Sequence, residues 1–413
     1  MNLIRNDIRR GKGSLCFTSR DVQSGPLIFW LTDSPFPKAA AIGSGLSYFT
    51  PEERMTAQKM PRLLNLDILR LVSALMVLTF HYGFRMRISG EGRGIGFPEL
   101  APFAIWFDTG LLIFFAISGY VITMSAEGRS AYDFAAGRFA RLWPTFIVCA
   151  TITAVVLAVW HVPTLDPPTV KQWLAHGVII SRSLGQPFLD GAYWTIAYEI
   201  IFYFWVFLLI ATGLFERGWR IVVLAWLAIS VVNEAFIGSG AIQKLLITEY
   251  SGYFAFGLAL YKVRQHASLS SLCVLAAAAC WAMATPFLTE PDFVETYGLS
   301  RSAVGLVLIG PLALAAVTVC ATAPSLRISP GLAIGLGGLT YPLYLLHQNI
   351  GYAVFARFGT DGNRWLVALV LVAVLLFVAW VIARTIEPGA RRGIIRAAGH
   401  LRDGFGRLRQ RTA

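Results

Sequence analysis

Repeated apolar stretches, each long enough to cross a lipid bilayer, limit the possible folds of this 413-residue chain more than any other feature. Inside hydrocarbon the backbone has to satisfy its own hydrogen bonds, which favours helices. Only 14% of the residues are charged, whereas soluble proteins usually carry about 25%. We therefore predict an all-α, polytopic transmembrane bundle of about ten spans, at 66–85, 102–125, 142–162, 192–214, 219–237, 242–262, 268–288, 302–322, 333–356 and 364–386.

The orientation of the bundle follows from lysine and arginine residues near the span ends, which favour the cytoplasmic side. The loops on the two sides carry similar numbers of these residues, so the tails decide. Lys59 and Arg62 precede the first span, and Arg391, Arg392 and Arg396 follow the last. Both termini are predicted to be cytoplasmic. We attribute much of the net charge of +12 to these tails and to anionic lipid headgroups, not to a nucleic acid partner.

Three parts are expected along the chain: an N-terminal tail at 1–60, a membrane domain at 61–386 and a basic cytoplasmic tail at 387–413. The first part lacks the order of regions that defines a signal peptide, so we interpret it as disordered or as a mis-assigned start. The five cysteines show no paired metal spacing, and no metal site is predicted. The sequence also lacks a Walker-type loop, a GxSxG elbow and an HExxH motif, which argues against an ATP-driven pump and a metallohydrolase.

The first span carries three ionisable side chains, Asp67, Arg70 and His81. Eleven residues are close to a whole number of helical turns, so Arg70 and His81 share one face, about 16 Å apart along the axis. Asp67, three residues before Arg70, lies on the same face. Ionisable groups inside a membrane are costly and usually mark a functional cavity. A histidine that merely packs in the core is the competing interpretation, and the two neighbouring charges favour function.

The fourth span contains a glutamate, Glu199, among the aromatic residues Trp194, Tyr198 and Tyr203. A buried glutamate needs a partner or a proton, so a functional role is again favoured. Purely structural roles compete for two other candidate residues. Trp194 fits an interfacial belt of aromatic residues equally well, and Ser118 in the second span is more typical of helix packing than of a nucleophile.

The predicted orientation assigns a depth to each polar group. Arg70 lies near the cytoplasmic end of its span, and Arg138 and Arg141 fall in the second loop at the cytoplasmic mouth. On their own, the two loop arginines would be ordinary positive-inside anchors. The outer half is expected to hold two imidazoles and a carboxylate, from His81, His347 and Glu199. This layout suits an anionic donor that enters from the cytoplasm.

Five motifs in order resemble the acyltransferase 3 family of bacterial membrane O-acyltransferases. They cover about 65–386, and their departures from the family pattern are mild: Thr195, Tyr120, Thr340 and Gln348. The motifs are LDILRLVSALMVLTFH with its Arg-x10-His spacing (66–81), FFAISGYVIT (114–123), RFARLWP (138–144), YWTIAYEIIFY (193–203) and LTYPLYLLHQ (339–348).

The resemblance implies transfer of an acyl group, with acetyl expected, from cytoplasmic acyl-CoA to a carbohydrate or glycolipid hydroxyl at the outer face. Acyl-CoA would be a substrate, with no permanently bound cofactor. His81 would be the general base and Glu199 would orient or recharge it. Arg70, Arg138 and Arg141 would hold the coenzyme A phosphates. The remaining candidate substrate-binding residues are Asp67, Ser118, Trp194, Tyr198, Tyr203, Tyr341, Tyr344 and His347, the last three on the acceptor side.

The expected location is the bacterial cytoplasmic membrane, with lipid bilayer as surroundings and no appended hydrolase domain. Direct transfer and an acyl-histidine intermediate both remain open, as do the acceptor, the acyl length and the hydroxyl that is modified. A different class, a transporter or flippase for a lipid-linked sugar, would also need intramembrane charges, although the sequence shows no internal repeat. A third class is a regulatory protein with an inactive acyltransferase fold, which the presence of His81 and Glu199 disfavours.

Overall fold

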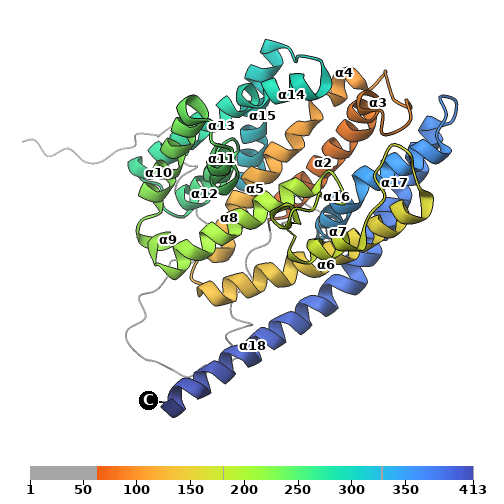
Figure 1. Cartoon of the computed structure of the whole chain (residues 1–413). Helices are drawn as coiled ribbons and strands as arrows, with labels where there is room; N and C mark the ends of the chain where they lie inside the picture. Colours follow the sequence, from red (N-terminus) through yellow and green to blue (C-terminus); the bar gives the residue numbers. More distant parts are fainter. Residues whose placement is uncertain (1–62, 180, 327–328, 413) are drawn as a thin grey trace, which may run out of the picture. The chain divides into compact units, whose positions relative to one another are not determined.

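The structure, a computed structural model, describes residues 63–412 except 180 and 327–328, and within them it is all-helical. The expectations for residues 1–60 therefore lie outside the described residues. The longer helices pack side by side in Figure 1. They are α2 (Leu64–Phe80), α5 (Gly110–Ala126), α6 (Ala131–Trp160), α8 (Tyr193–Ala211), α10 (Trp219–Val232), α12 (Ser251–Gln265), α13 (Leu269–Leu288), α15 (Ala303–Thr322), α16 (Pro330–Phe358), α17 (Arg364–Val381) and α18 (Glu387–Thr412).

Short helical segments connect or extend these helices. Three are π-helical turns that continue a longer helix: η1 (His81–Arg85), η5 (Asn233–Ile237) and η6 (Ile382–Ile386). The others are the 3-10 turns η2 (Phe107–Thr109), η3 (His176–Val178) and η4 (Ser181–Leu184), and the helices α3 (Met86–Ser89), α4 (Ala101–Ala104), α7 (Val170–Ala175), α9 (Leu214–Arg217), α11 (Gly240–Leu246) and α14 (Glu290–Tyr297).

Eight helices in the described part of the chain are long and apolar enough to cross a membrane, which makes this an integral membrane protein of the predicted all-α class. Two predicted spans are absent from that set. The first, 242–262, is broken into α11 and the 15-residue α12, and the second, 333–356, falls within the glycine-containing α16. Both helices are heavily buried at the centre of the bundle. Because they are not among the eight candidate spans, the count of ten spans stays a prediction.

The centre of the bundle depends on close approach between helix backbones. A methyl group at Gly119 of α5 or Gly257 of α12 would overlap a backbone carbonyl of the facing helix. Small residues at such crossings are the usual means of packing membrane helices, because lipid provides little hydrophobic drive for association. Gly119, the residue next to Ser118, therefore has a role in helix packing.

α6 begins eleven residues earlier than the predicted third span. Ser130 supplies the cap, accepting a hydrogen bond from the backbone N–H of Asp133, and the helix runs unbroken from Ala131. Arg138 and Arg141, predicted in a loop, therefore lie on a helix. The basic tail is helical as well: α18 packs along α6, with Arg402 paired to Asp133 at 2.9 Å.

The segment 161–192 does not stay beyond the end of α6 but folds back along it. Trp143 Nε1 donates to the Gly177 carbonyl at 2.8 Å, and the Phe146 ring contacts the rings of His176 and Tyr193. His176 is fully buried, donates from Nδ1 to the Gln172 carbonyl and accepts from a backbone N–H at Nε2. Burial lowers the pKa of His176, in keeping with this neutral, structural role.

Because of this return, α8 starts at the level of Phe146 and not at the end of α6. Tyr193, its first residue, is fully buried against Phe146, which lies fourteen residues before the end of α6. At 1.5 Å per residue this is about 20 Å along the helix. Residues of α8 therefore lie much closer to the start of α6 than the sequence predicted.

Candidate active site

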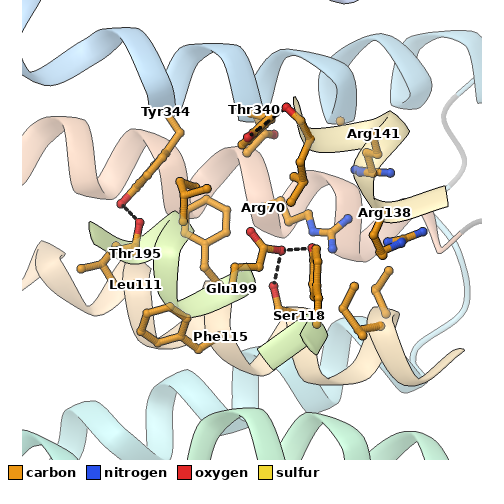
Figure 2. A pocket seen from close by; sticks show the side chains of 18 residues that line it. Arg70, Leu111, Phe115, Ser118, Arg138, Arg141, Thr195, Glu199, Thr340 and Tyr344 are labelled. Carbon is orange, nitrogen blue, oxygen red and sulfur yellow. Dashed lines mark hydrogen bonds between the residues drawn. The ribbon is translucent and has the colours of Figure 1, made fainter. Parts of the chain in front are cut away.

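Three arginines and a glutamate from three helices line one internal cavity, which we call the arginine chamber. Arg70 comes from α2, Arg138 and Arg141 from α6, and Glu199 from α8 (Figure 2). Eighteen side chains or backbones form its wall: Arg70, Leu111, Phe114, Phe115, Ser118, Val121, Ile122, Arg138, Arg141, Leu142, Thr195, Ile196, Glu199, Tyr203, Gly337, Thr340, Tyr341 and Tyr344. Its volume is about 90 Å³, so it is narrow.

Glu199 is held within the chamber by two hydroxyl groups. Ser118 Oγ donates to Glu199 Oε1 at 3.1 Å, and the hydroxyl of Tyr203, one turn along α8, donates to the same oxygen. Arg70 lies beside this carboxylate and also pairs with Asp67 across one helical turn, at 3.7 Å. The shared face predicted for Asp67 and Arg70 is confirmed by this ion pair.

The chamber has two chemically different ends, as Figure 2 shows. Arg138 and Arg141 lie at one end, and Leu111, Thr195 and Tyr344 at the other, with Glu199 between them. At the second end, the hydroxyls of Thr195 and Tyr344 are hydrogen-bonded to each other at 2.8 Å. A ligand with an anionic head and a neutral chain would match this polarity.

Two histidines form a pair beyond the neutral end of the chamber. The rings of His81 and His347 are 5.0 Å apart, edge to face, and both are buried. His81 Nδ1 is hydrogen-bonded to the hydroxyl of Tyr352 at 2.8 Å. His347 Nδ1 lies 2.7 Å from the Tyr344 carbonyl, which can only accept, so this nitrogen carries the proton.

This assignment leaves the other ring nitrogen of His347 with a lone pair. His347 Nε2 is buried and has no hydrogen-bond partner among the residues described. An unpaired buried acceptor is costly, and such atoms occur where a ligand or a reacting group completes the bonding. The pair therefore offers a proton acceptor in a protected position, which is what a general base requires.

A second cavity, which we call the histidine cavity, opens beside His81 and has a volume of about 210 Å³. Its wall combines aromatic, hydroxyl and charged side chains from α2, η1, α5, α14 and neighbouring segments. The lining residues are Val77, Phe80, His81, Arg85, Asp108, Thr109, Leu111, Leu112, Trp194, Tyr250, Pro286, Thr289, Asp292, Phe293, Thr296, Tyr297, Arg301 and Ile309.

The two cavities share a wall. Leu111 lines both of them. Tyr344, which lines the arginine chamber, packs its ring against His347, with centroids 5.4 Å apart. Leu111 and Tyr344 therefore connect the chamber with the surroundings of the histidine pair.

The predicted site residues are distributed between the two cavities differently from what we expected. Glu199 was expected beside the two imidazoles, and the structure places it with the arginines. Tyr341 and Tyr344 were expected on the acceptor side with His347, but both line the arginine chamber. His81 and Trp194 line the histidine cavity, and the ring of Tyr198 packs against Trp194 at 5.4 Å. The pairing of Glu199 with His81 is thus replaced by a pairing of His347 with His81.

Several site residues were missed from the sequence. Tyr352 bonds His81, Tyr82 donates to the His347 carbonyl, and Arg85, Asp108 and others line the histidine cavity. Tyr352 follows the last motif by four residues, where the spacing of a helix face could have indicated it. Tyr82 and Arg85 lie in η1, at the end of the predicted first span, and Asp108 lies in the 3-10 turn η2; the sequence does not specify the partners of these residues.

No group of histidine, cysteine, aspartate and glutamate side chains arranged to hold a metal ion occurs among the described residues. Cys149 is buried, Cys273 and Cys280 are exposed, and Cys320 is partly buried, and each is a free thiol. Cys16 lies outside the described residues.

Comparison with known proteins agrees with the motif order. The acyltransferase 3 family model, described as an acyltransferase domain, matches residues 63–384. An O-acetyl transferase of Shigella phage Sf6 is 22% identical over 245 residues, which cover 53% of this chain and 69% of the phage protein. No solved structure matches the chain.

Proposed function

The chain belongs to the acyltransferase 3 family and is an O-acyltransferase, and from this premise we propose that it moves an acetyl group from cytoplasmic acetyl-CoA to a carbohydrate hydroxyl at the outer face of a bacterial cytoplasmic membrane. One observation carries the proposal. A chamber lined by three arginines lies next to a buried pair of histidines, with Leu111 and Tyr344 between them. Along the first span, Arg70 in the chamber and His81 in the pair are about 16 Å apart.

The donor would enter at the arginine end of the chamber. Guanidinium groups form paired hydrogen bonds with phosphate oxygens, so Arg70, Arg138 and Arg141 suit the phosphates of coenzyme A. A chamber of about 90 Å³ has room for an extended chain and not for a nucleotide. The nucleotide would remain at the mouth, and the pantetheine arm would run past Glu199 toward Thr195 and Tyr344.

The reaction would take place where the arm reaches the histidine pair. His81, our proposed base, takes the proton of the acceptor hydroxyl while its oxygen attacks the thioester carbonyl carbon. The carbon–sulfur bond then breaks, coenzyme A leaves with its electron pair, and the imidazolium returns the proton to the sulfur. The products are an O-acetyl ester and free coenzyme A. Tyr352 would fix the tautomer of His81, and His347 Nε2 would share the proton.

Glu199 is better suited to the donor than to His81. Its carboxylate accepts from Ser118 and Tyr203 and lies beside Arg70, so it would hold the chamber open and orient that guanidinium. Asp67, which pairs with Arg70 at 3.7 Å, would help to orient the same guanidinium. We therefore propose Glu199 as a positioning residue of the donor chamber.

The test is a direct transfer assay with purified protein in lipid nanodiscs. Acetyl-CoA and a bacterial surface glycan are supplied, free thiol is measured, and O-acetyl groups are detected by mass spectrometry. We expect thiol release to depend on the glycan and to disappear in His81→Ala. In cells, His81→Ala should leave glycan export unchanged and remove its acetylation. Loss of export itself would favour the flippase instead.

A further inference from the structure

The histidine cavity has features that the transfer of an acetyl group does not by itself require. Its lining includes the buried His81 and also residues of the short helix α14, of which Asp292 and Thr296 are exposed. The cavity therefore leads from the surface at α14 to the proposed base. Its volume, about 210 Å³, is more than twice that of the arginine chamber.

Two polar atoms on lining residues of this cavity lack partners. Asp108 Oδ2 accepts from Arg301 at 2.8 Å, but Asp108 Oδ1 is buried and has no hydrogen bond to any residue described. The same holds for Arg85 Nε, although the other nitrogens of that side chain reach Tyr297 and Glu91. Unsatisfied buried donors and acceptors on the wall of a cavity indicate a polar ligand.

Aromatic rings form much of the remaining wall. Trp194 and Tyr250 lie 5.8 Å apart, and Phe293 and Tyr297 lie 4.6 Å apart on α14. Flat apolar faces beside carboxylate and hydroxyl groups are complementary to a sugar ring, which has an apolar face and a rim of hydroxyls.

The charges in the cavity favour an uncharged ring over an acidic one. Both cations that line the cavity are already paired with carboxylates: Arg301 with Asp108 at 2.8 Å and Glu290 at 2.6 Å, and Arg85 with Glu91 at 3.4 Å. Asp292 at the mouth has no cation within ion-pair distance among the described residues. A uronic acid entering past Asp292 would meet like charge, which costs free energy.

We infer that the histidine cavity is the acceptor subsite, that it takes one uncharged sugar unit, and that Asp292 and Thr296 of α14 select it. This inference rests on the proposed function. One hydroxyl of the ring lies at His81, the ring faces pack on the aromatic residues, and other hydroxyls bond Asp108 and Asp292. The acceptor tyrosines predicted from the sequence are thereby replaced by residues of α14 and its surroundings.

The inference is tested by binding without turnover. Saturation-transfer NMR on the purified protein in nanodiscs, without acetyl-CoA, uses methyl glucoside, methyl galactoside and methyl glucuronide as probes. We expect at least one of the two neutral glycosides to bind and the glucuronide not to bind. Asp292→Asn and Thr296→Val should each weaken binding at least fivefold. Glu295→Gln is the matched control, because Glu295 is an exposed acid on the same helix but does not line the cavity.

Three outcomes would overturn the inference: no binding of either neutral glycoside, equal binding of the glucuronide, or unchanged binding in both cavity variants. Because no donor is present, these outcomes are separate from the proposed function. A protein that transfers acetyl groups but binds glycosides equally well in Asp292→Asn and Thr296→Val keeps the function and loses the subsite. A protein that binds as expected but never releases thiol from acetyl-CoA keeps the subsite and loses the function.

Discussion

Replacing Gly110 by alanine is expected to separate α5 from α2 at the wall between the two cavities. Gly110 is the first residue of α5 and precedes Leu111, which lines both cavities. An alanine Cβ at this position would lie 2.5 Å from the backbone carbonyl oxygen of Ser73 and 2.9 Å from a methyl of Val77. The backbone at Gly110 is already right-handed helical, so the added methyl group is the whole perturbation.

The size of the effect follows from that distance. Ordinary contacts of a Cβ begin near 3.4 Å, so the two helices have to move apart by about 0.9 Å, and the obstacle is backbone that cannot rotate away. Overpacking of this kind usually costs about 1–3 kcal/mol. A displacement near 1 Å of groups that position a reaction can reduce the rate by about 10²-fold. We therefore expect lower stability and a 10- to 100-fold lower kcat for Gly110→Ala.

Gly137→Ala is the matched control. Gly137 lies inside helix α6, directly before Arg138, and its nearest neighbour is a side-chain nitrogen 3.8 Å away. Alanine is favoured over glycine in a helix by about 0.5–1 kcal/mol, so this variant should be slightly more stable. Thermal unfolding of both variants in detergent, followed by the transfer assay, checks the pair. If Gly110→Ala unfolds at the same temperature as Gly137→Ala and keeps the wild-type rate, the close approach of α2 and α5 is refuted.

Three further outcomes are expected. His347→Asn keeps a donor for the Tyr344 carbonyl but removes the free Nε2, so kcat should fall 10²- to 10⁴-fold in the transfer assay, the usual range for acid–base catalysis, and an unchanged kcat would exclude His347 from proton transfer. Arg141→Lys keeps the positive charge but loses the guanidinium group that can form two parallel hydrogen bonds to a phosphate, so the KM for acetyl-CoA should rise about tenfold. The control Arg217→Lys, at an exposed arginine, should leave this KM unchanged, and equal KM values for the two variants would contradict the donor chamber. Trp143→Phe removes the hydrogen bond to the Gly177 carbonyl, which should lower the free energy of unfolding by about 1 kcal/mol and reduce the hydrogen-exchange protection of the segment 161–192.

The helices were the most predictable part of the fold. The apolar length of each span decides that it crosses a bilayer, and this property belongs to one segment alone. The two predicted spans that are not long and apolar enough to cross a membrane, around α12 and α16, lie at the centre of the bundle. Their neighbours in the bundle satisfy groups that lipid could not, so the apolar signal weakens where burial in protein is greatest.

The chemistry of the first span was also predictable, because it depends on spacing within one helix. Asp67 and Arg70 pair as three-residue spacing requires, and His81 lies further along the same helix in a buried position. The partners of His81 were not predictable from that spacing. Tyr352 and His347 come from a helix more than 260 residues away in sequence, and only packing brings α2 and α16 together.

The depth of Glu199 shows where sequence reasoning fails and why. Its position was counted from the outer surface, on the assumption that a span starts where the preceding loop ends. The loop instead returns along α6 for about 20 Å, held by Trp143 and by the buried His176, and α8 starts from that depth. A carboxylate placed there meets three arginines and not two imidazoles. The loop 161–192, which carries none of the motifs, therefore decides which cavity Glu199 lines. A change in that loop would move Glu199 relative to the arginines and to the histidine pair.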